Sequence, residues 1–283
     1  MPESKFGDSL RSSPMGEPIG DEQSLTVAQA IANLRGPDPG LRYYAAWWLG
    51  RFRVATPEAI SALIDSLSDE ADRTAEGGYP LRRNAARALG KLGNLQAVPA
   101  LIRCLECDDF YVREAAVQSL GMLGDRSCIP VLMSFLEGGL AVAQPTPGKI
   151  NLPQPYNAIL EALGALNATE AVPLIEPFLD HPFEMLQYAA ARAMYELTQN
   201  PVYAERLVRA LAGEKLPLRR AALADLGAIG YLPAADAIAQ TLAENSLKLI
   251  ALKGLLEKQV QEATPPNLTA DALQVMELMD SLL

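Results

Sequence analysis

A motif of about 31 residues recurs along this chain and constrains its fold more than any other feature. Each copy opens with an apolar residue and usually an arginine, continues with small residues, and then has a Leu-Gly pair. These pairs, with Met-Tyr in place of one, begin at Leu49, Leu89, Leu120, Leu163, Met194 and Leu226. Their spacings are 40, 31, 43, 31 and 32 residues. Repeats of this length are typical of solenoids, in which each unit buries its apolar face by stacking on its neighbours.

Proline and glycine divide each repeat into two helices. Pro99 and Pro130 lie where the first turn of a helix tolerates proline, and Gly93 and Gly124 lie where the preceding helix should end. Runs of alternating β-branched residues are missing, which argues against strands. The sequence therefore predicts an all-α fold, an α-solenoid of about six helical pairs. The pattern resembles HEAT-like repeats, and that resemblance implies that the Arg-Ala-Ala helix lines the concave face.

The domain organisation follows from the interruptions of the repeat. Residues 1–23 are rich in Ser, Pro, Gly and acidic residues, which predicts a disordered tail. Residues 24–283 form a single repeat domain with insertions near 69–80 and 137–155. The tail lacks the apolar core of a signal peptide, and there is no run of about 18 apolar residues to span a membrane. We therefore expect a cytoplasmic protein with no membrane span.

Charge and cysteine content exclude some functions. The formal net charge is −10, whereas a nucleic-acid-binding protein needs a broad basic surface, so we expect no nucleic acid partner. Cys104 and Cys107 have C-x-x-C spacing, and Cys128 follows one repeat later, but a fourth zinc ligand is missing. Buried reduced thiols are the favoured interpretation, and we expect no metal site.

Catalytic signatures are largely missing from the sequence. The only histidine is His181, so a Ser-His-Asp or Cys-His site would have to use that residue. The sequence has neither a G-x-S-x-G elbow nor a Gly-rich phosphate loop.

Helical spacing assigns one face of each inner helix to the groove. In the first repeat this face carries Tyr43, Trp47 and Arg51, and in the second it carries Arg83, Arg87 and Lys91. An aromatic stripe beside a basic one suits a flat, anionic, conjugated ligand or an acidic partner surface. The alternatives are that the aromatic residues cap the end of the solenoid and that the basic residues form a solvated face.

A second set of arginines occupies one fixed position of the repeat, at Arg42, Arg82, Arg113 and Arg219. Because the position recurs, we expect these arginines to form a structural ladder with acids such as Asp38 and Asp108.

Longer stretches of the chain are more specific than the repeat motif. One of them contains Leu-Arg-Tyr-Tyr-Ala-Ala-Trp-Trp-Leu-Gly. The stretches are residues 36–54, 72–90, 107–116, 154–164 and 187–195. They closely resemble the E subunits of the E/F-type phycobilin lyases, and the resemblance runs from about Leu25 to Leu211.

This resemblance implies a function. The E subunit pairs with an F-type subunit, and the heterodimer binds phycocyanobilin, an open-chain tetrapyrrole. The lyase attaches this bilin through a thioether to a cysteine of the phycocyanin α subunit in cyanobacteria. Phycocyanobilin is then a bound substrate, with no prosthetic group, and the nucleophile belongs to the substrate protein.

The resemblance also suggests roles for the groove residues. Tyr43, Tyr44 and Trp47 would stack on the bilin or shape its site, with Arg51 beside them. Arg83 and Arg87 would bind its propionates, because a guanidinium group can hold a carboxylate through two hydrogen bonds.

Acids and a flap complete the expected site. Asp109 or Glu114 would act as the acid that keeps the bilin protonated. Arg73, Glu76 and Tyr79 lie in the first insertion, which could close over the ligand. The alternative to a lyase subunit is a non-catalytic adaptor or chaperone that binds only protein. Within the same family, two further possibilities are a lyase that also isomerises the bilin and an activity that removes it.

Overall fold

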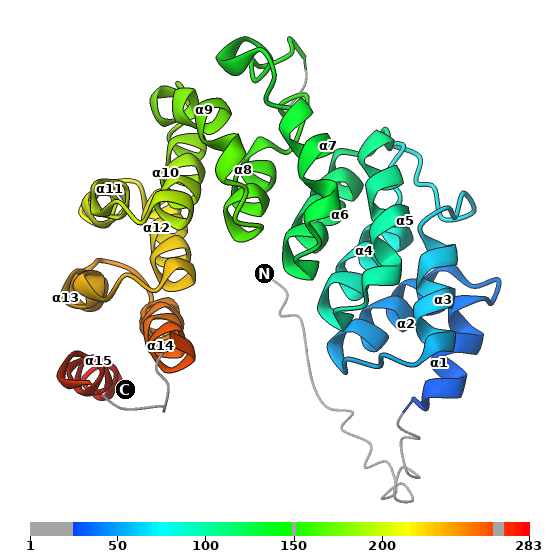
Figure 1. The fold of residues 1–283 in the computed structure, drawn as a ribbon. Coiled ribbons are helices and arrows are strands. Elements are labelled where there is room, and N and C mark those ends of the chain that lie inside the picture. The colour runs from blue at the N-terminus through cyan, green and yellow to red at the C-terminus, as the bar shows by residue number, and fades with distance from the viewer. Residues whose placement is uncertain (1–24, 149–150, 263–268) are drawn as a thin grey trace, which may run out of the picture.

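The computed structural model describes residues 25–148, 151–262 and 269–283, and all regular structure in these segments is helical. The tail expected at residues 1–23 lies outside them. The helices form an arch of two layers (Figure 1). The inner layer comprises α2 (Pro39–Arg51), α4 (Pro80–Leu92), α6 (Phe110–Leu123), α8 (Tyr156–Ala165), α10 (Glu184–Thr198), α12 (Leu216–Ile229) and α14 (Asn245–Glu262). The outer layer comprises α1 (Val27–Leu34), α3 (Pro57–Ser66), α5 (Val98–Arg103), α7 (Ile129–Ser134), α9 (Val172–Ile175), α11 (Pro201–Ala210), α13 (Ala235–Gln240) and α15 (Ala270–Asp280).

The all-α solenoid is confirmed, and it is longer than the motif indicated. The described segments hold seven helical pairs followed by α15, whereas the sequence predicted about six pairs. The additional pair is α13 and α14, in which Leu252-Lys253 stands where most other inner helices have Leu-Gly. In these segments we find no helix both long and apolar enough to cross a membrane.

The expected helix signals lie where the sequence placed them. Pro99 and Pro130 occupy the first turns of α5 and α7. Gly93 and Gly124 end α4 and α6 in the left-handed conformation, with φ of 71° and 73°. Only glycine adopts this conformation without a steric cost, so these two positions fix where the inner helices end.

The glycine of the Leu-Gly pair does not end a helix, because it lies inside the inner helix, where it contacts the next inner helix. A Cβ atom at Gly90 would lie 2.9 Å from the Cα of Ser119 on the next inner helix. At Gly227 it would lie 2.9 Å from the Cα of Ala251. These glycines let neighbouring inner helices approach closely, and the motif recurs because the same contact recurs.

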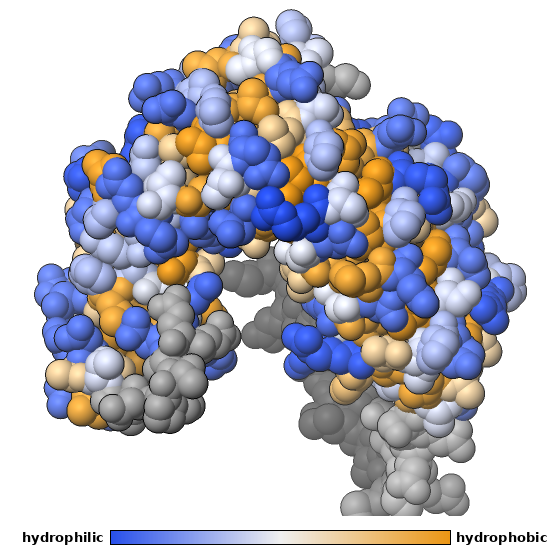
Figure 2. Space-filling view, viewed as in Figure 1, coloured by the Kyte–Doolittle hydropathy of each residue, from blue (hydrophilic) through white to orange (hydrophobic). Residues whose placement is uncertain are grey.

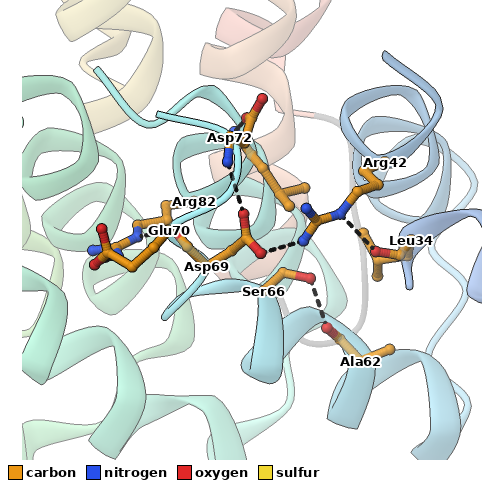
Figure 3. A network of polar contacts seen from close by, with 9 residues as sticks. Leu34, Arg42, Ala62, Ser66, Asp69, Glu70, Asp72 and Arg82 are labelled. Carbon is orange, nitrogen blue, oxygen red and sulfur yellow. Dashed lines mark hydrogen bonds and ion pairs between the residues drawn. The ribbon is translucent and has the colours of Figure 1, made fainter. Parts of the chain in front are cut away.

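The first insertion is folded onto the repeat arginines (Figure 3). Arg42 forms an ion pair with Asp69, and its Nε donates to the Leu34 carbonyl at 3.2 Å. Arg82 pairs with Glu70, and its Nε donates to the Asp69 carbonyl at 2.7 Å. These contacts hold the loop between α3 and α4 in place.

The structural role of the arginine ladder is therefore confirmed, but its predicted partners are wrong. The Asp38 carboxylate accepts the Leu41 amide and caps α2 instead of pairing with Arg42. Arg113 donates to the backbone carbonyl of Asp108, not to its side chain. Arg219 likewise donates to backbone carbonyls.

The thiols behave mostly as expected. Cys104 and Cys128 are buried, and burial raises the pKa of each to about 11. Cys107 is partly exposed and lies 3.9 Å from Nη1 of Arg82. Among the described residues, no group of three or more His, Cys, Asp or Glu side chains could hold a metal ion.

Candidate functional site on the concave face

Each inner helix has one face left for solvent. On the inner helices from α4 to α12, outer helices cover one side and neighbouring inner helices cover two more, so the exposed face is the concave one, whereas α2 and α14 each have a single inner neighbour (Figure 1). On α4 this face carries Arg83, Arg87 and Lys91, whereas the intervening Asn84 and Ala88 are buried. The concave face borders a hollow between the two limbs of the arch, with many hydrophilic side chains at its edge (Figure 2).

One position of the repeat defines the middle row of this face. It contains Trp47, Arg87, Gln118, Glu161 and Arg192, one from each inner helix from α2 to α10. Their spacings of 40, 31, 43 and 31 residues equal those of the first five Leu-Gly positions. Residues with the same repeat offset occupy equivalent places on successive helices, so the middle row runs along the groove.

The aromatic residues of α2 are exposed on the surface. Tyr43 is 40% exposed and Trp47 is 43% exposed, while the Tyr44 ring lies 5.5 Å from the Trp47 ring. Trp48 is partly buried and packs against Phe52, with ring centroids 4.9 Å apart. The packing interpretation therefore fits Trp48, whereas Tyr43, Tyr44 and Trp47 present free aromatic surface.

The neighbouring cations have no anionic partner. Within the described residues, none of Arg51, Arg83, Arg87 and Lys91 forms an ion pair. Most of the other arginines form an ion pair with a carboxylate or donate hydrogen bonds to backbone carbonyls. The guanidinium of Arg83 lies 5.9 Å from the centre of the Tyr111 ring on α6, and its buried Nε has no hydrogen-bond partner. Free guanidinium groups beside exposed aromatic rings can bind a flat ligand that carries carboxylates.

Tyr79 and Asp109 are already engaged in structural contacts. Tyr79 is only 6% exposed, its hydroxyl donates to Glu70 at 3.1 Å, and the Arg82 guanidinium lies 4.0 Å from its ring centre. Oδ2 of Asp109 accepts the Tyr79 amide at 2.7 Å, and Oδ1 accepts the Tyr111 amide at 2.8 Å. Asp109 therefore joins the first insertion to the start of α6.

The remaining residues of the first insertion lie near a separate cleft. Arg73 is exposed, with its guanidinium 5.5 Å from the centre of the Tyr79 ring. Glu76 and Asp109 line a cleft of about 620 Å³ between the two insertions, together with Phe110 and Tyr111. Tyr111 also contacts Arg83, so this cleft adjoins the basic part of the groove. The ligand role of these residues remains a prediction.

The sequence reasoning missed a charged cluster in the other half of the groove, the Arg192 cluster. Nη1 of Arg192 on α10 lies 3.6 Å from Oε2 of Glu161 on α8 and 3.3 Å from Oδ1 of Asp225 on α12. Its Nε lies 3.3 Å from Oε1 of Glu196 on α10. The repeat offset alone could have placed Glu161 and Arg192 side by side, because both belong to the middle row.

Burial dominates the titration of this cluster. Burial raises the pKa of Glu161 to about 7, with a smaller raising effect from the carboxylates of Asp225, Glu196 and Glu114, whereas the charge of Arg192 acts in the opposite direction. Burial also raises the pKa values of Glu196 and Asp225. Glu114 of α6, one of the two expected acids, thus lies close to the cluster.

Comparisons with known proteins agree with this architecture. A family model described as HEAT repeats matches residues 75–139, and one described as PBS lyase HEAT-like repeat matches residues 41–69 and 156–181. The phycocyanobilin lyase subunit alpha of Microchaete diplosiphon is 65% identical over 270 residues, covering 94% of this chain and 92% of that protein. The protein of the same name from Nostoc sp. strain PCC 7120 is 62% identical, covering 94% and 97%.

A solved structure extends the likeness to the backbone. The chain superimposes with a TM-score of 0.85 on a chain of the complex of CpcE and CpcF of phycocyanin lyase from Nostoc sp. PCC7120. The sequences are 61% identical, and the match covers 96% of this chain and 100% of that one.

Proposed function

This chain belongs to the family of the phycocyanobilin lyase alpha subunits, and we propose that it is one subunit of a heterodimeric bilin lyase. The complex binds phycocyanobilin and attaches it through a thioether to a cysteine of the phycocyanin α subunit. The observation that carries the proposal is the identity of about two thirds to a named lyase subunit over nearly the whole length of both chains. The expected cytoplasmic location belongs to the same proposal.

An F-type subunit is the proposed partner. The solved relative is one chain of a complex of two different proteins that together are named a phycocyanin lyase. With 61% identity across the whole of that chain, the surfaces that meet the second protein have counterparts here.

In this reaction the lyase has to position the two reactants and does not have to supply a nucleophile. The sulfur of the acceptor cysteine bonds to the exocyclic ethylidene carbon of ring A, and the C=C double bond becomes single. The thiol loses its proton, and the ring carbon at the other end of that bond gains one, so the net change is addition of S–H. Holding both reactants in register can supply several kcal/mol of the barrier reduction.

The only histidine is poorly suited to activate a thiol. His181 is 1% exposed, its Nε2 lies 3.2 Å from the Ala143 carbonyl, and its Nδ1 accepts the Phe183 amide at 3.0 Å. Both ring nitrogens are therefore engaged within the fold. This arrangement supports a mechanism in which the acceptor protein supplies the reactive group.

The N-terminal half of the concave face is the proposed bilin site. Tyr43, Tyr44 and Trp47 would stack against the conjugated rings, since aromatic faces pack well on flat π systems. Arg83 and Arg87 would each bind a propionate, because both lack an anionic partner in the described structure.

The test is reconstitution of attachment. The chain, an F-type subunit, the phycocyanin α subunit and the phycocyanobilin pathway would be co-expressed, and covalent bilin would be detected by zinc-induced fluorescence and absorbance of the denatured α subunit. We expect attachment only with both lyase subunits present. Stable heterodimer without bilin binding or attachment would favour the adaptor alternative.

The groove assignment has its own test. Replacing Tyr43 and Trp47 together by alanine should weaken bilin binding about 10-fold or more, since each aromatic contact contributes about 1 kcal/mol. Leu95→Ala, which changes a residue 53% exposed in the turn between α4 and α5, is the control. Unchanged bilin affinity in the double variant would refute the stacking role.

A further inference from the structure

The Arg192 cluster holds more carboxyl groups than its single cation can neutralise. Glu161, Glu196 and Asp225 surround one guanidinium, so full ionisation would leave two negative charges among largely buried side chains. Glu114 from α6 adds negative charge beside Glu161, and Lys258 from α14 acts on Glu196. The adjoining outer helix α7 carries no titratable residue. Like charges at this distance favour retention of a proton by one of the carboxyl groups.

Glu161 is the member best placed to use that proton on a ligand. Its side chain is 36% exposed, against 18% for Glu196 and 10% for Asp225. It also has the longest contact with Arg192, 3.6 Å against 3.3 Å for the other two. The proton should therefore reside where the carboxyl group is least paired and still open to the groove.

The surroundings leave the other two acids less exposed than Glu161. Glu196 lies so close to Gly164 that a Cβ atom there would come within 2.1 Å of Oε2, and this buried oxygen has no hydrogen-bond partner. Asp225 is buried and binds Arg192. Both are therefore less accessible to a ligand than Glu161, and both act on Glu161 through charge.

The position of Glu161 relates it to the proposed bilin site. It belongs to the middle row together with Trp47 and Arg87, and only Gln118 lies between Arg87 and Glu161 in that row. Adjacent packed helices lie about 8–10 Å apart, so a ligand that reaches Glu161 from α4 spans about two such steps. An extended molecule with anionic groups at one place and basic nitrogens at another fits this separation of charges.

We propose that Glu161 is the acid of the groove and donates its carboxyl proton to the basic ring nitrogen of the bound tetrapyrrole. This inference rests on the proposed function. The proton moves from the Glu161 oxygen to the nitrogen that lacks one, which leaves a carboxylate beside a cationic bilin. The acceptor sulfur then adds to the ethylidene carbon, and its own proton leaves to solvent. The ring carbon takes a proton from water, and the nitrogen returns its proton to Glu161.

The experiment uses the heterodimer with the F-type subunit loaded with phycocyanobilin. The absorbance of the non-covalently bound bilin is recorded from about pH 5.5 to about pH 9 for the wild type, Glu161→Gln and the control Glu170→Gln. Glu170 lies in the turn between α8 and α9, in an exposed pair with Arg126. Protonation changes the visible spectrum of a bilin, so this readout reports the proton directly and does not depend on turnover.

We expect the wild type and Glu170→Gln to share one spectral transition, and Glu161→Gln to bind bilin with that transition abolished. Attachment by Glu161→Gln should be about 100-fold slower or more, a typical loss for a missing general acid. The same transition in Glu161→Gln would overturn the inference. A wild-type complex that binds no bilin would instead refute the proposed function.

A second variant leaves Glu161 in place. Asp225→Asn removes a neighbouring carboxylate and frees Arg192 to interact with Glu161, so the transition should move to lower pH. A midpoint that stays at the wild-type pH would contradict the role of the Arg192 cluster, even if Glu161→Gln could not be loaded with bilin.

Discussion

Replacing Gly90 by alanine tests whether the glycine of the Leu-Gly motif is needed for the close contact between neighbouring inner helices. The added Cβ would lie 2.6 Å from Oγ, 2.8 Å from Cβ and 2.9 Å from Cα of Ser119. Carbon atoms in ordinary contact lie about 3.5–4.0 Å apart. The Cβ and Cα atoms of Ser119 are fixed to the backbone of α6, so the clash cannot be relieved by rotating a side chain, and α4 and α6 must separate.

The magnitude follows from three contributions. Overpacking of a tight contact costs about 1–3 kcal/mol. The hydrogen bond from the Ser119 hydroxyl to the Ala86 carbonyl, 2.8 Å long, would be disturbed at a cost of about 1 kcal/mol. Alanine in place of glycine inside a helix returns about 1 kcal/mol. The expected net destabilisation is about 1–3 kcal/mol.

The assay is chemical and thermal unfolding followed by circular dichroism. A loss of this size lowers the Tm by about 2–4 °C per kcal/mol for a domain of this class. Gly121→Ala is the matched control, because its Cβ would lie 3.1 Å from the nearest atoms of Ala162 and needs only a small adjustment. If Gly90→Ala were as stable as Gly121→Ala, the close approach of α4 and α6 would be refuted.

Three further predictions concern titratable side chains. His181→Phe should destabilise the chain by about 2–3 kcal/mol, measured by urea unfolding, because a buried carbonyl and a backbone amide lose their partners. Cys104 and Cys128 should react with a thiol reagent at about pH 8 far more slowly than in urea, as followed by mass spectrometry, because burial raises both pKa values to about 11. The pKa of Glu161 is raised from 4.5 to about 7, so the native state binds the extra proton, and this contribution to stability is lost as pH rises across that range. The Tm of the wild type minus that of Glu161→Gln should therefore fall between about pH 4.5 and pH 7, and a constant difference would contradict the assignment.

The helices and the middle row of the concave face were predictable because their sequence signals are local and periodic. Proline and glycine mark helix ends within a single repeat, and the recurring Leu-Gly pair records one contact repeated between neighbours. Arg83 and Arg87 were assigned to the concave face from helical spacing and the resemblance to HEAT-like repeats, and their exposed or half-buried positions on α4 agree with that assignment.

The contacts of the insertions were not predictable in the same way. Asp69 and Glu70 bind Arg42 and Arg82 because the loop between α3 and α4 turns back over the inner helices. No repeat offset encodes that turn. For the same reason the burial of Tyr79 under Arg82 was missed, although the sequence places it beside the helix that it covers.

The Arg192 cluster could not be predicted from any single repeat. Its members come from α8, α10 and α12, and Asp225 stands one residue beyond the position equivalent to Arg192. The cluster becomes visible only when three repeats are stacked, because none of them contains more than one acid and one cation of the group.

The concave face therefore has a polarity that the net charge of −10 conceals. Free cations lie on α2 and α4, whereas α8 to α12 hold a surplus of carboxyl groups around Arg192. A ligand that carries carboxylates and basic nitrogens at different places gains from both halves in only one orientation, and the reverse orientation brings like charges together. Reversing the charge of Arg87 with Arg87→Glu should consequently lower bilin affinity more than Arg87→Ala does. Equal affinities in the two variants would show that charge at this position does not orient the ligand.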